Sequence, residues 1–264
     1  MPELKALLER HGLKPTKRWG QHFLISEKVV SAICAAVPDT VQGILEVGPG
    51  PGVLTSVLSE RSKLIAVEID DVAVSALGES SPKATVIAGD ALRMDLAELL
   101  MQTPKPRMIV SNMPYNITGP LLTAFTMVRH HLDGCVLMMQ KEVAQRIMAK
   151  PGERELGSLS VMLQSRFVID RVIEAPSSAF FPPPKVDSTV LKFTPRETGW
   201  ESDFDAVHER VVRQAFTQPR KTLANNLKQV GFDPSSMGWA STIRPHQIAI
   251  ADWETLVRRL YDPK

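Results

Sequence analysis

The stretch GILEVGPGPG, residues 43–52, decides the fold of this chain. It opens with an apolar run of strand character, and glycines follow at positions 48, 50 and 52. Glycine permits a tight turn and lets a ligand approach the backbone closely. The next segment, VLTSVLSER at 53–61, has the apolar spacing of a helix. A strand, a glycine-rich loop and a helix in this order predict the ligand-binding unit of an α/β sheet.

The alternation of strand and helix continues along the chain. A helix is expected at 26–37, with Ser26 as its N-cap. Short apolar strands then alternate with helices, a pattern typical of a parallel, doubly wound sheet with both faces covered. The further strands are expected at 63–69, 84–89, 107–112 and 134–140, and the helices at 71–79, 96–102, 119–128 and 141–149.

The pattern changes toward the C-terminus. Two strand-like runs, at 166–175 and 187–195, have no long helix between them, which predicts an antiparallel pair. Helical patterns follow at 203–217, 220–230 and 245–260. We therefore expect two domains. They are a Rossmann-like α/β domain with an N-terminal arm over 1–195, and a small all-α domain over 196–264.

The composition limits the class of protein. Hydrophobic residues make up 44% of the 264 and charged residues 23%, which are ordinary values for a globular chain. A net charge of +2 does not by itself indicate a nucleic-acid binder. However, five basic residues and no acidic one lie between Arg210 and Lys228. Such a face can contact phosphates, or it can be a solvated helix face.

Neither a membrane nor an oxidising compartment is indicated. Cys34 and Cys135 are far apart, lie in apolar surroundings and lack metal-ligand or redox spacing, so a reduced, intracellular setting is favoured. The N-terminus lacks the apolar centre of a signal peptide, and no apolar run approaches the roughly 20 residues that span a bilayer. We expect a soluble, cytoplasmic monomer without a metal site.

Unusual residues are predicted at the strand ends, where ligands of a doubly wound sheet bind. Gly48 and Gly50 follow the first strand, Glu68 ends the second, and Asp90 follows the third. They form neither G-x-G-x-x-G nor a Walker loop. The pattern resembles the S-adenosylmethionine pocket of class I methyltransferases, with Glu68 suited to the ribose hydroxyls and Asp90 to the adenine amino group. Alternatively, Asp90 caps a helix and Glu68 is a surface acid.

The fourth strand ends in SNMPYN, residues 111–116. Pro114 fixes its own backbone angle and pushes Met113 toward an extended conformation, so Asn112 and Tyr115 project from a stiff turn. An isolated N-x-P-Y is also an ordinary turn. Methyltransferases that act on the exocyclic amine of adenine carry a similar turn. The likeness implies that the Asn112 oxygen and the Pro114 carbonyl accept the amine N–H groups while Tyr115 stacks on the base.

Four segments resemble one family, the rRNA adenine dimethyltransferases. KRWGQHFL at 17–24 resembles K-x-x-G-Q-x-F-L, and NMPY at 112–115 matches N-[LI]-P-Y apart from its methionine. SAFFPPPKVDS at 178–188 matches F-x-P-x-P-x-V-x-S. RQAFTQPRKTLANNL at 213–227 resembles F-x-x-R-R-K-x-x-x-N-x-L, with Pro219 where an arginine is common.

This resemblance implies roles for individual residues. The N-terminal arm closes over the cofactor, and many relatives have Asn where His22 stands. Phe180 forms a second aromatic wall that sandwiches the target adenine with Tyr115, although FFPPPK also suits a polyproline spacer and Phe180 a core position. Asn112 is shared between cofactor and substrate. The cofactor-binding residues expected are Gln21, His22, Leu24, Gly48, Gly50, Glu68, Asp90 and Asn112.

RNA is expected to dock on the C-terminal helices. Arg220 and Lys221 follow Pro219 and would open a helix, whose free N–H groups could also bind a phosphate. A target base must leave its stack, which costs a few kcal/mol, and phosphate contacts would supply that energy. The RNA-binding residues expected are Arg213, Arg220, Lys221 and Lys228.

The resemblance implies dimethylation of two adjacent adenosines near the 3′ end of 16S rRNA in the 30S subunit, with a role in small-subunit biogenesis. An Erm-type 23S rRNA methyltransferase shares the cofactor and N-[LI]-P-Y motifs, but PPPKVDS and PRKTLANNL favour the small-subunit type. A binding protein, either an assembly checkpoint or a mitochondrial transcription-factor relative, would make catalysis secondary. The intact Asn112, Pro114, Tyr115 and Glu68 argue against a degenerate active site, and the resemblance allows a checkpoint role alongside catalysis. DNA adenine methyltransferases usually carry D-P-P-Y instead.

Overall fold

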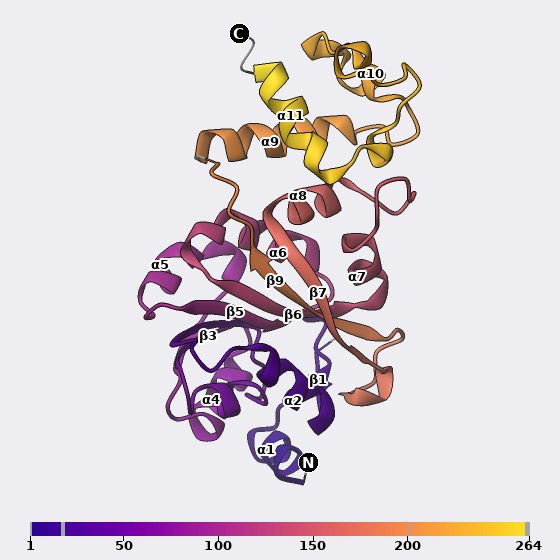
Figure 1. Cartoon of the computed structure of the whole chain (residues 1–264). Coiled ribbons are helices and arrows are strands. Elements are labelled where there is room, and N and C mark those ends of the chain that lie inside the picture. Colours follow the sequence, from indigo (N-terminus) through magenta and orange to yellow (C-terminus); the bar gives the residue numbers. More distant parts are fainter. Residues whose placement is uncertain (1, 17–18, 201, 262–264) are drawn as a thin grey trace. The chain divides into compact units, whose positions relative to one another are not determined.

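The computed structural model describes residues 2–16, 19–200 and 202–261 (Figure 1). The described chain divides into two compact units. The first comprises Met1–Ala144 and Ile169–Pro195, and the second comprises Gln145–Val168 and Arg196–Lys264. Residues 145–168, which the sequence pattern assigned to the first domain, thus group with the C-terminal helices. None of the helices in the described residues is long and apolar enough to cross a membrane.

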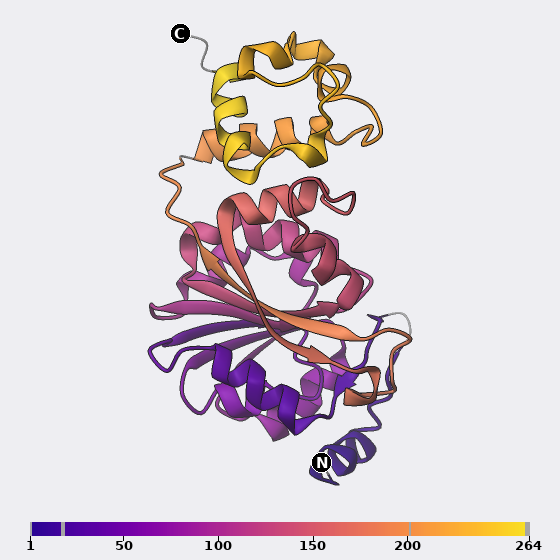
Figure 2. The same cartoon turned by 45° about the vertical axis from the view of Figure 1, so that its right-hand side comes forward.

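The first unit is built on a mixed sheet. Within the described residues it has seven strands in the order β4-β3-β2-β5-β6-β9-β7 (Figures 1 and 2). Strands β4, β3, β2, β5 and β6 run parallel, and β9 is antiparallel to β6. The predicted mostly parallel sheet with an antiparallel end is therefore confirmed. The strands are β2 (Gly43–Val47), β3 (Lys63–Glu68), β4 (Thr85–Ala88), β5 (Arg107–Asn112), β6 (Gly134–Gln140), β7 (Phe167–Ala175) and β9 (Ser188–Pro195).

Helices cover both faces of this sheet (Figure 2). Two of them begin at an aspartate N-cap, because Asp70 accepts from the Val72 N–H and Asp95 from the N–H groups of Ala97 and Glu98. The helix predicted at 53–61 is reduced to a single turn. The helices are α2 (Glu27–Ala36), α3 (Thr55–Leu58), α4 (Asp71–Ser80), α5 (Leu96–Met101), α6 (Thr118–Met127) and α7 (Lys141–Ile147).

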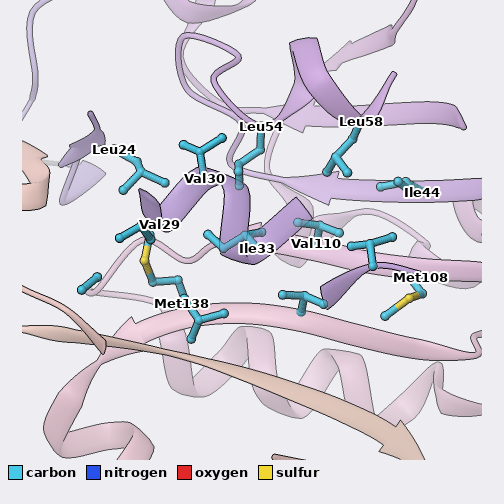
Figure 3. Close-up of a cluster of buried hydrophobic side chains, with 14 of the residues drawn as sticks. Leu24, Val29, Val30, Ile33, Ile44, Leu54, Leu58, Met108, Val110 and Met138 are labelled. Atoms are coloured by element: carbon cyan, nitrogen blue, oxygen red, sulfur yellow. The ribbon is translucent and has the colours of Figure 1, made fainter. Parts of the chain in front are cut away.

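One core cluster holds α2 against the middle of the sheet (Figure 3). Val29, Val30 and Ile33 form the buried face of α2, at the i, i+1, i+4 spacing of an amphipathic helix. They pack with side chains from β2, β5 and β6. All five residues of β2 are buried, as expected for a parallel strand covered on both faces. The sheet positions that carry the pocket are therefore fixed by packing from both sides.

An N-terminal arm, whose secondary structure the sequence did not reveal, completes the first unit. Helix α1 (Pro2–His11) contacts α4, with a shared cluster of Leu7, Leu8, Leu13, Phe23, Ala73 and Ala76. The arm then forms strand β1 (Phe23–Leu24), which pairs antiparallel with β8 (Phe180–Phe181). Strands of two residues have no periodicity to detect, so only tertiary pairing defines them.

The second unit is helical. Helices α8 (Ser158–Arg166), α9 (Ser202–Ala215) and α11 (Ile250–Tyr261) surround a core that includes Trp253, Val212 and Leu256. The guanidinium of Arg166 is buried, and its Nε donates to Asp205 Oδ1 at 2.8 Å. This ion pair links α8 to α9, and the shared core includes residues of segment 145–168, which therefore belongs with the C-terminal helices.

The helix predicted at 220–230 is much shorter. Helix α10 (Leu223–Asn226) is one turn, and Thr222 caps it by accepting from the Asn225 N–H. A 3₁₀ turn over Lys228–Val230 follows and ends at Gly231, which has a left-handed φ of 68°. Arg220 and Lys221 therefore precede the helix instead of opening it. The prediction that they begin a helix was wrong, because the Thr222 cap and Gly231 confine the helical turns between them.

Candidate active site

A pocket opens at the carboxyl ends of β2, β3 and β5, beside the loop that follows β4. Parallel strands all end on the same edge of the sheet, so residues from four separate loops meet there. The N-terminal arm adds a further wall. Ten of the residues singled out from the sequence line this pocket: Gln21, His22, Leu24, Gly48, Gly50, Glu68, Asp90, Asn112, Pro114 and Tyr115.

The glycine loop after β2 forms the floor of the pocket. Gly48 and Gly50 have φ values of 68° and 56°, in the left-handed region that favours glycine. A Cβ at Gly48 would lie 3.5 Å from the Pro114 ring, and one at Gly50 would lie 3.4 Å from the Phe23 ring. Both glycines are thus needed for their backbone conformation, and an added Cβ would lie against neighbouring side chains of the pocket.

Glu68, at the end of β3, holds the glycine loop in place. Its Oε2 accepts from the Gly50 N–H at 2.9 Å, and its Oε1 accepts from the N–H groups of Ile69 and Asp70 at 2.9 and 3.0 Å. Burial raises the pKa of this carboxyl, and the three backbone hydrogen bonds act in the opposite direction. The surface-acid interpretation is wrong, because Glu68 is only 4% exposed.

Asp90 follows β4 and has two functions available to it. Its Oδ1 accepts from the Leu92 N–H at 3.0 Å and so caps the 3₁₀ turn Ala91–Arg93. The same side chain lines the pocket and is about one-third exposed. The capping interpretation is therefore correct. Capping uses only Oδ1, so Oδ2, which lies 3.6 Å from Arg93 Nε, can still meet a ligand.

The arm is fastened to the pocket by side-chain hydrogen bonds. Gln21 Nε2 donates to Asp70 Oδ2 at 2.8 Å, and Gln21 Oε1 accepts from the Thr16 N–H at 2.8 Å. Asn112 Nδ2 donates to the His22 carbonyl at 3.3 Å. Lys17 and Arg18, which begin the first family-like segment, lie outside the described residues.

The turn after β5 presents Asn112 and Tyr115 as the sequence predicted, with Met113 buried between them. The Met113 N–H donates to the Met138 carbonyl at 3.1 Å, which anchors the turn to β6. The nitrogen of the Asn112 side chain donates to the arm, so its oxygen is the atom available to a ligand in the pocket. The Pro114 carbonyl already accepts from the Ile117 N–H and from Thr118 Oγ1, both at 3.2 Å.

Tyr115 is held from two directions. Its hydroxyl and that of Ser188, the first residue of β9, lie 2.5 Å apart, and burial raises the pKa of the phenol. The His22 ring stacks on Tyr115 with centroids 5.4 Å apart and planes 28° apart. His22 Nδ1 lies 2.7 Å from the Pro182 carbonyl, which can only accept, so Nδ1 carries a proton. Tyr115 is thus fixed in one orientation before any ligand binds.

Phe180, expected as a second aromatic wall, is buried in the core. It is 2% exposed, packs in the cluster around α2, and is paired with Leu24 across the β1–β8 ribbon. Its neighbour Phe181 is 52% exposed. Successive side chains of a strand point to opposite faces, so only one of the two rings can face away from the core.

The four basic residues predicted to bind RNA lie in the second unit. Arg213 Nε donates to Glu209 Oε1 at 2.8 Å, one helical turn away on α9. Arg220, Lys221 and Lys228 lie in the turns on either side of α10. The side chains of all four are exposed.

Glu46 is a pocket residue to which the sequence gave no role. It lies within β2, is 1% exposed, and lines the pocket. Burial raises the pKa of its carboxyl to about 8, and the nearby Glu68 adds to this shift. Among the described residues, Glu46 Oε2 has no hydrogen-bond partner. An acid inside an otherwise apolar strand was the signal available in the sequence.

The stability of the fold should therefore depend on pH through Glu46. The unfolded chain releases this proton near pH 4.5, whereas the folded chain holds it up to about pH 8. The free energy of unfolding of the wild type should thus fall by a few kcal/mol, relative to Glu46→Gln, as pH rises from 4.5 to 8. Urea unfolding of both proteins at pH 5, 6.5 and 8 measures the difference. A difference that does not change with pH would contradict this assignment.

The polar groups around the pocket suit S-adenosylmethionine. A buried carboxylate at the end of β3 can accept from a ribose hydroxyl. In the described residues, the buried carboxyl of Glu46 on β2 has one oxygen, Oε2, without a hydrogen-bond partner. Glycines in the left-handed backbone region line the pocket, where a ligand can approach the backbone closely. The fold and this pocket define the chain as a class I S-adenosylmethionine-dependent methyltransferase.

Comparisons with known proteins agree and are more specific. Residues 12–249 match the family described as ribosomal RNA adenine dimethylase. The ribosomal RNA small subunit methyltransferase A of Chromobacterium violaceum is 40% identical over 94% of this chain and 96% of its own length, and that of Thiobacillus denitrificans is 38% identical over 93% and 98%. The crystal structure of a dimethyladenosine transferase from Plasmodium falciparum superposes with a TM-score of 0.73 at 25% identity, covering 90% of this chain and 97% of that one. The chain belongs to the ribosomal RNA adenine dimethylase family.

Proposed function

We propose that this enzyme dimethylates the exocyclic amino groups of two adjacent adenosines near the 3′ end of 16S rRNA, within the 30S subunit. The observation that carries the proposal is that the Asn112–Tyr115 turn and the Gly48–Glu68 cofactor floor line one pocket. The names of the similar bacterial proteins support the small-subunit target. An rRNA substrate in turn supports action in the cytoplasm during small-subunit biogenesis. We propose that the enzyme acts as a monomer.

The cofactor would lie along the strand ends. Glu68 would bind the ribose hydroxyls. Its backbone donors leave one lone pair, on Oε2, so a second hydroxyl would have to share Oε1 with the N–H groups of Ile69 and Asp70. Asp90 would meet the adenine amino group. The loop at Gly48 and Gly50 would bring the backbone close to the ligand, and Gln21, His22 and Leu24 would cover it. When bound, S-adenosylmethionine supplies a methyl group on a positively charged sulfur.

Asn112 would orient the target amine. The lone pair of an adenine amino group is delocalised into the ring, so the nitrogen is a weak nucleophile. Accepting an N–H on the Asn112 oxygen would favour tetrahedral geometry and aim the lone pair at the methyl group. The Pro114 carbonyl would have to share its oxygen with Ile117 and Thr118 to contribute a second acceptor. A strong general base is not needed, because the amine becomes acidic once it is methylated.

Tyr115 would stack on the target base. Its orientation is set by Ser188 and His22, so little freedom is lost when the base arrives. Base–aromatic stacking is worth about 1–3 kcal/mol, comparable to the cost of taking a base out of its stack. Phe180 would contribute indirectly. Its ring packs in the core and so fixes the β1–β8 ribbon, whose strand β1 belongs to the arm.

Methyl transfer from labelled S-adenosylmethionine to undermethylated 30S subunits tests the proposal. We expect label on 30S subunits and none on 50S subunits or naked 16S rRNA. Label found only on 50S subunits would show an Erm-type enzyme instead. Tight binding to 30S subunits without any label would show an assembly factor.

The second unit would dock on folded rRNA through its exposed basic residues. Changing Arg220 and Lys221 together to alanine should weaken 30S binding and flatten the slope of log affinity against log salt by up to about two units, one for each phosphate contact. The cofactor affinity should not change. The double variant Lys28→Ala and Lys105→Ala removes the same charge from exposed positions in the first unit and serves as the control. Equal salt slopes for both double variants would mean that Arg220 and Lys221 form only a solvated face.

A further inference from the structure

Phe181 is an exposed aromatic side chain with no role in the function proposed above. It is 52% exposed, although most large apolar side chains of this chain are buried. It begins the segment that leads from β8 to β9, in which Val186 is also 46% exposed and Lys185 is exposed. A ring, an apolar side chain and a cation therefore lie on one short connection.

Strand pairing places Phe181 next to a residue that lines the pocket, although Phe181 is not itself part of the lining. Its partner across the β1–β8 ribbon is Phe23, which lines the pocket and lies against Gly50. The next residue, Pro182, accepts from His22 Nδ1 at 2.7 Å, and the His22 ring stacks on Tyr115. A short chain of contacts thus links the exposed ring to the tyrosine that would hold the target base.

The segment that carries Phe181 is held at both ends. Prolines at 182, 183 and 184 restrict its backbone. At its far end, Asp187 Oδ1 accepts from the Ser177 N–H at 3.0 Å, and the Asp187 carbonyl accepts from the Lys141 N–H at 2.9 Å. A side chain on such a segment is presented to a ligand at little cost in conformational freedom.

We propose that Phe181 stacks on the base next to the target adenine, an inference that rests on the proposed rRNA substrate. When the target base enters the pocket, its neighbour loses a stacking partner, and an aromatic ring beside the pocket can replace it. Lys185 on the same segment would meet the adjoining phosphate. An aromatic ring beside a cation is the combination with which proteins bind unstacked nucleic acid.

The test compares variants that separate stacking from apolar bulk. Phe181→Ala and Phe181→Leu remove the ring, whereas Phe181→Trp keeps one. Met127→Ala, at a 65% exposed position on α6, is the control. The half-saturating concentration of undermethylated 30S subunits and the turnover at saturation would be measured, together with cofactor affinity by calorimetry.

We expect the alanine and leucine variants to raise the half-saturating concentration at least 5-fold, the lower end of the range for one base–aromatic stack. The tryptophan and control variants should stay within 2-fold of the wild type, and cofactor affinity should be equal in all. A leucine variant equal to the wild type would overturn the inference, since apolar contact alone would then suffice, for instance with a ribosomal protein. A wild-type protein that leaves 30S subunits unlabelled would instead overturn the proposed function, and the inference with it.

Discussion

Replacing Asn112 with alanine is expected to lower methyl transfer to 30S subunits by at least 100-fold while the fold and cofactor pocket persist. Removing one preorganised polar partner of a reacting group typically costs about 10²–10³ in rate. Asn112 ends β5, where Met113 is anchored to β6 independently of the asparagine side chain. The loss should therefore appear in turnover at saturating substrate more than in stability, which thermal unfolding would check.

The Asn112→Asp variant distinguishes the role of the side-chain oxygen from that of the side-chain nitrogen. The carboxylate keeps an acceptor for the substrate amine but loses the N–H that donates to the His22 carbonyl. We expect the aspartate variant to retain more activity than the alanine variant. If the alanine variant turned over within a few-fold of the wild type, Asn112 would not be the residue that orients the amine.

Glu68→Ala is expected to weaken S-adenosylmethionine binding by at least 100-fold. Hydrogen bonds to a charged group contribute about 1.5–3 kcal/mol each, and two ribose hydroxyls would lose their acceptor. The variant would also free the N–H groups of Gly50, Ile69 and Asp70, so the glycine loop would lose its anchor. Calorimetric titration with the cofactor measures the loss.

Asp71→Ala provides the matched control for Glu68. Asp71 is an exposed carboxylate three residues along, in the first turn of α4, and it lies outside the pocket lining. The cofactor affinity of the Asp71→Ala variant should equal that of the wild type. A folded Glu68→Ala protein with unchanged affinity for S-adenosylmethionine would contradict the proposal that Glu68 binds the ribose.

The sheet could be predicted well because its strands are buried on both faces. Strands β2, β5 and β6 begin and end where the sequence placed them, since apolar runs between glycine, proline or charged residues leave little choice of boundary. The pocket residues at the strand ends followed from that placement. The carboxyl ends of parallel strands must meet at one edge.

Features that depend on tertiary contacts were not predictable. Helix α8 carries buried residues on several faces, so its sequence lacks the one-sided periodicity of a surface helix. The sequence could not show which of the rings of Phe180 and Phe181 is buried, because the register of β8 against β1 decides which ring enters the core. Glu46 was overlooked because burial, and not residue type, gives its carboxyl an unusual pKa.

The pairing of β1 with β8 also bears on how the protein is made. Residues 23–24 leave the ribosome early in synthesis, yet their partners at 180–181 emerge more than a hundred residues later. The two-stranded ribbon, and with it the pocket wall formed by Phe23 and Leu24, cannot assemble on a nascent chain that lacks β8. A polypeptide that stalls before residue 180 can build the strands around the glycine loop but not close the arm over them. The arm can therefore close over the pocket only after residues 180 and 181 have left the ribosome.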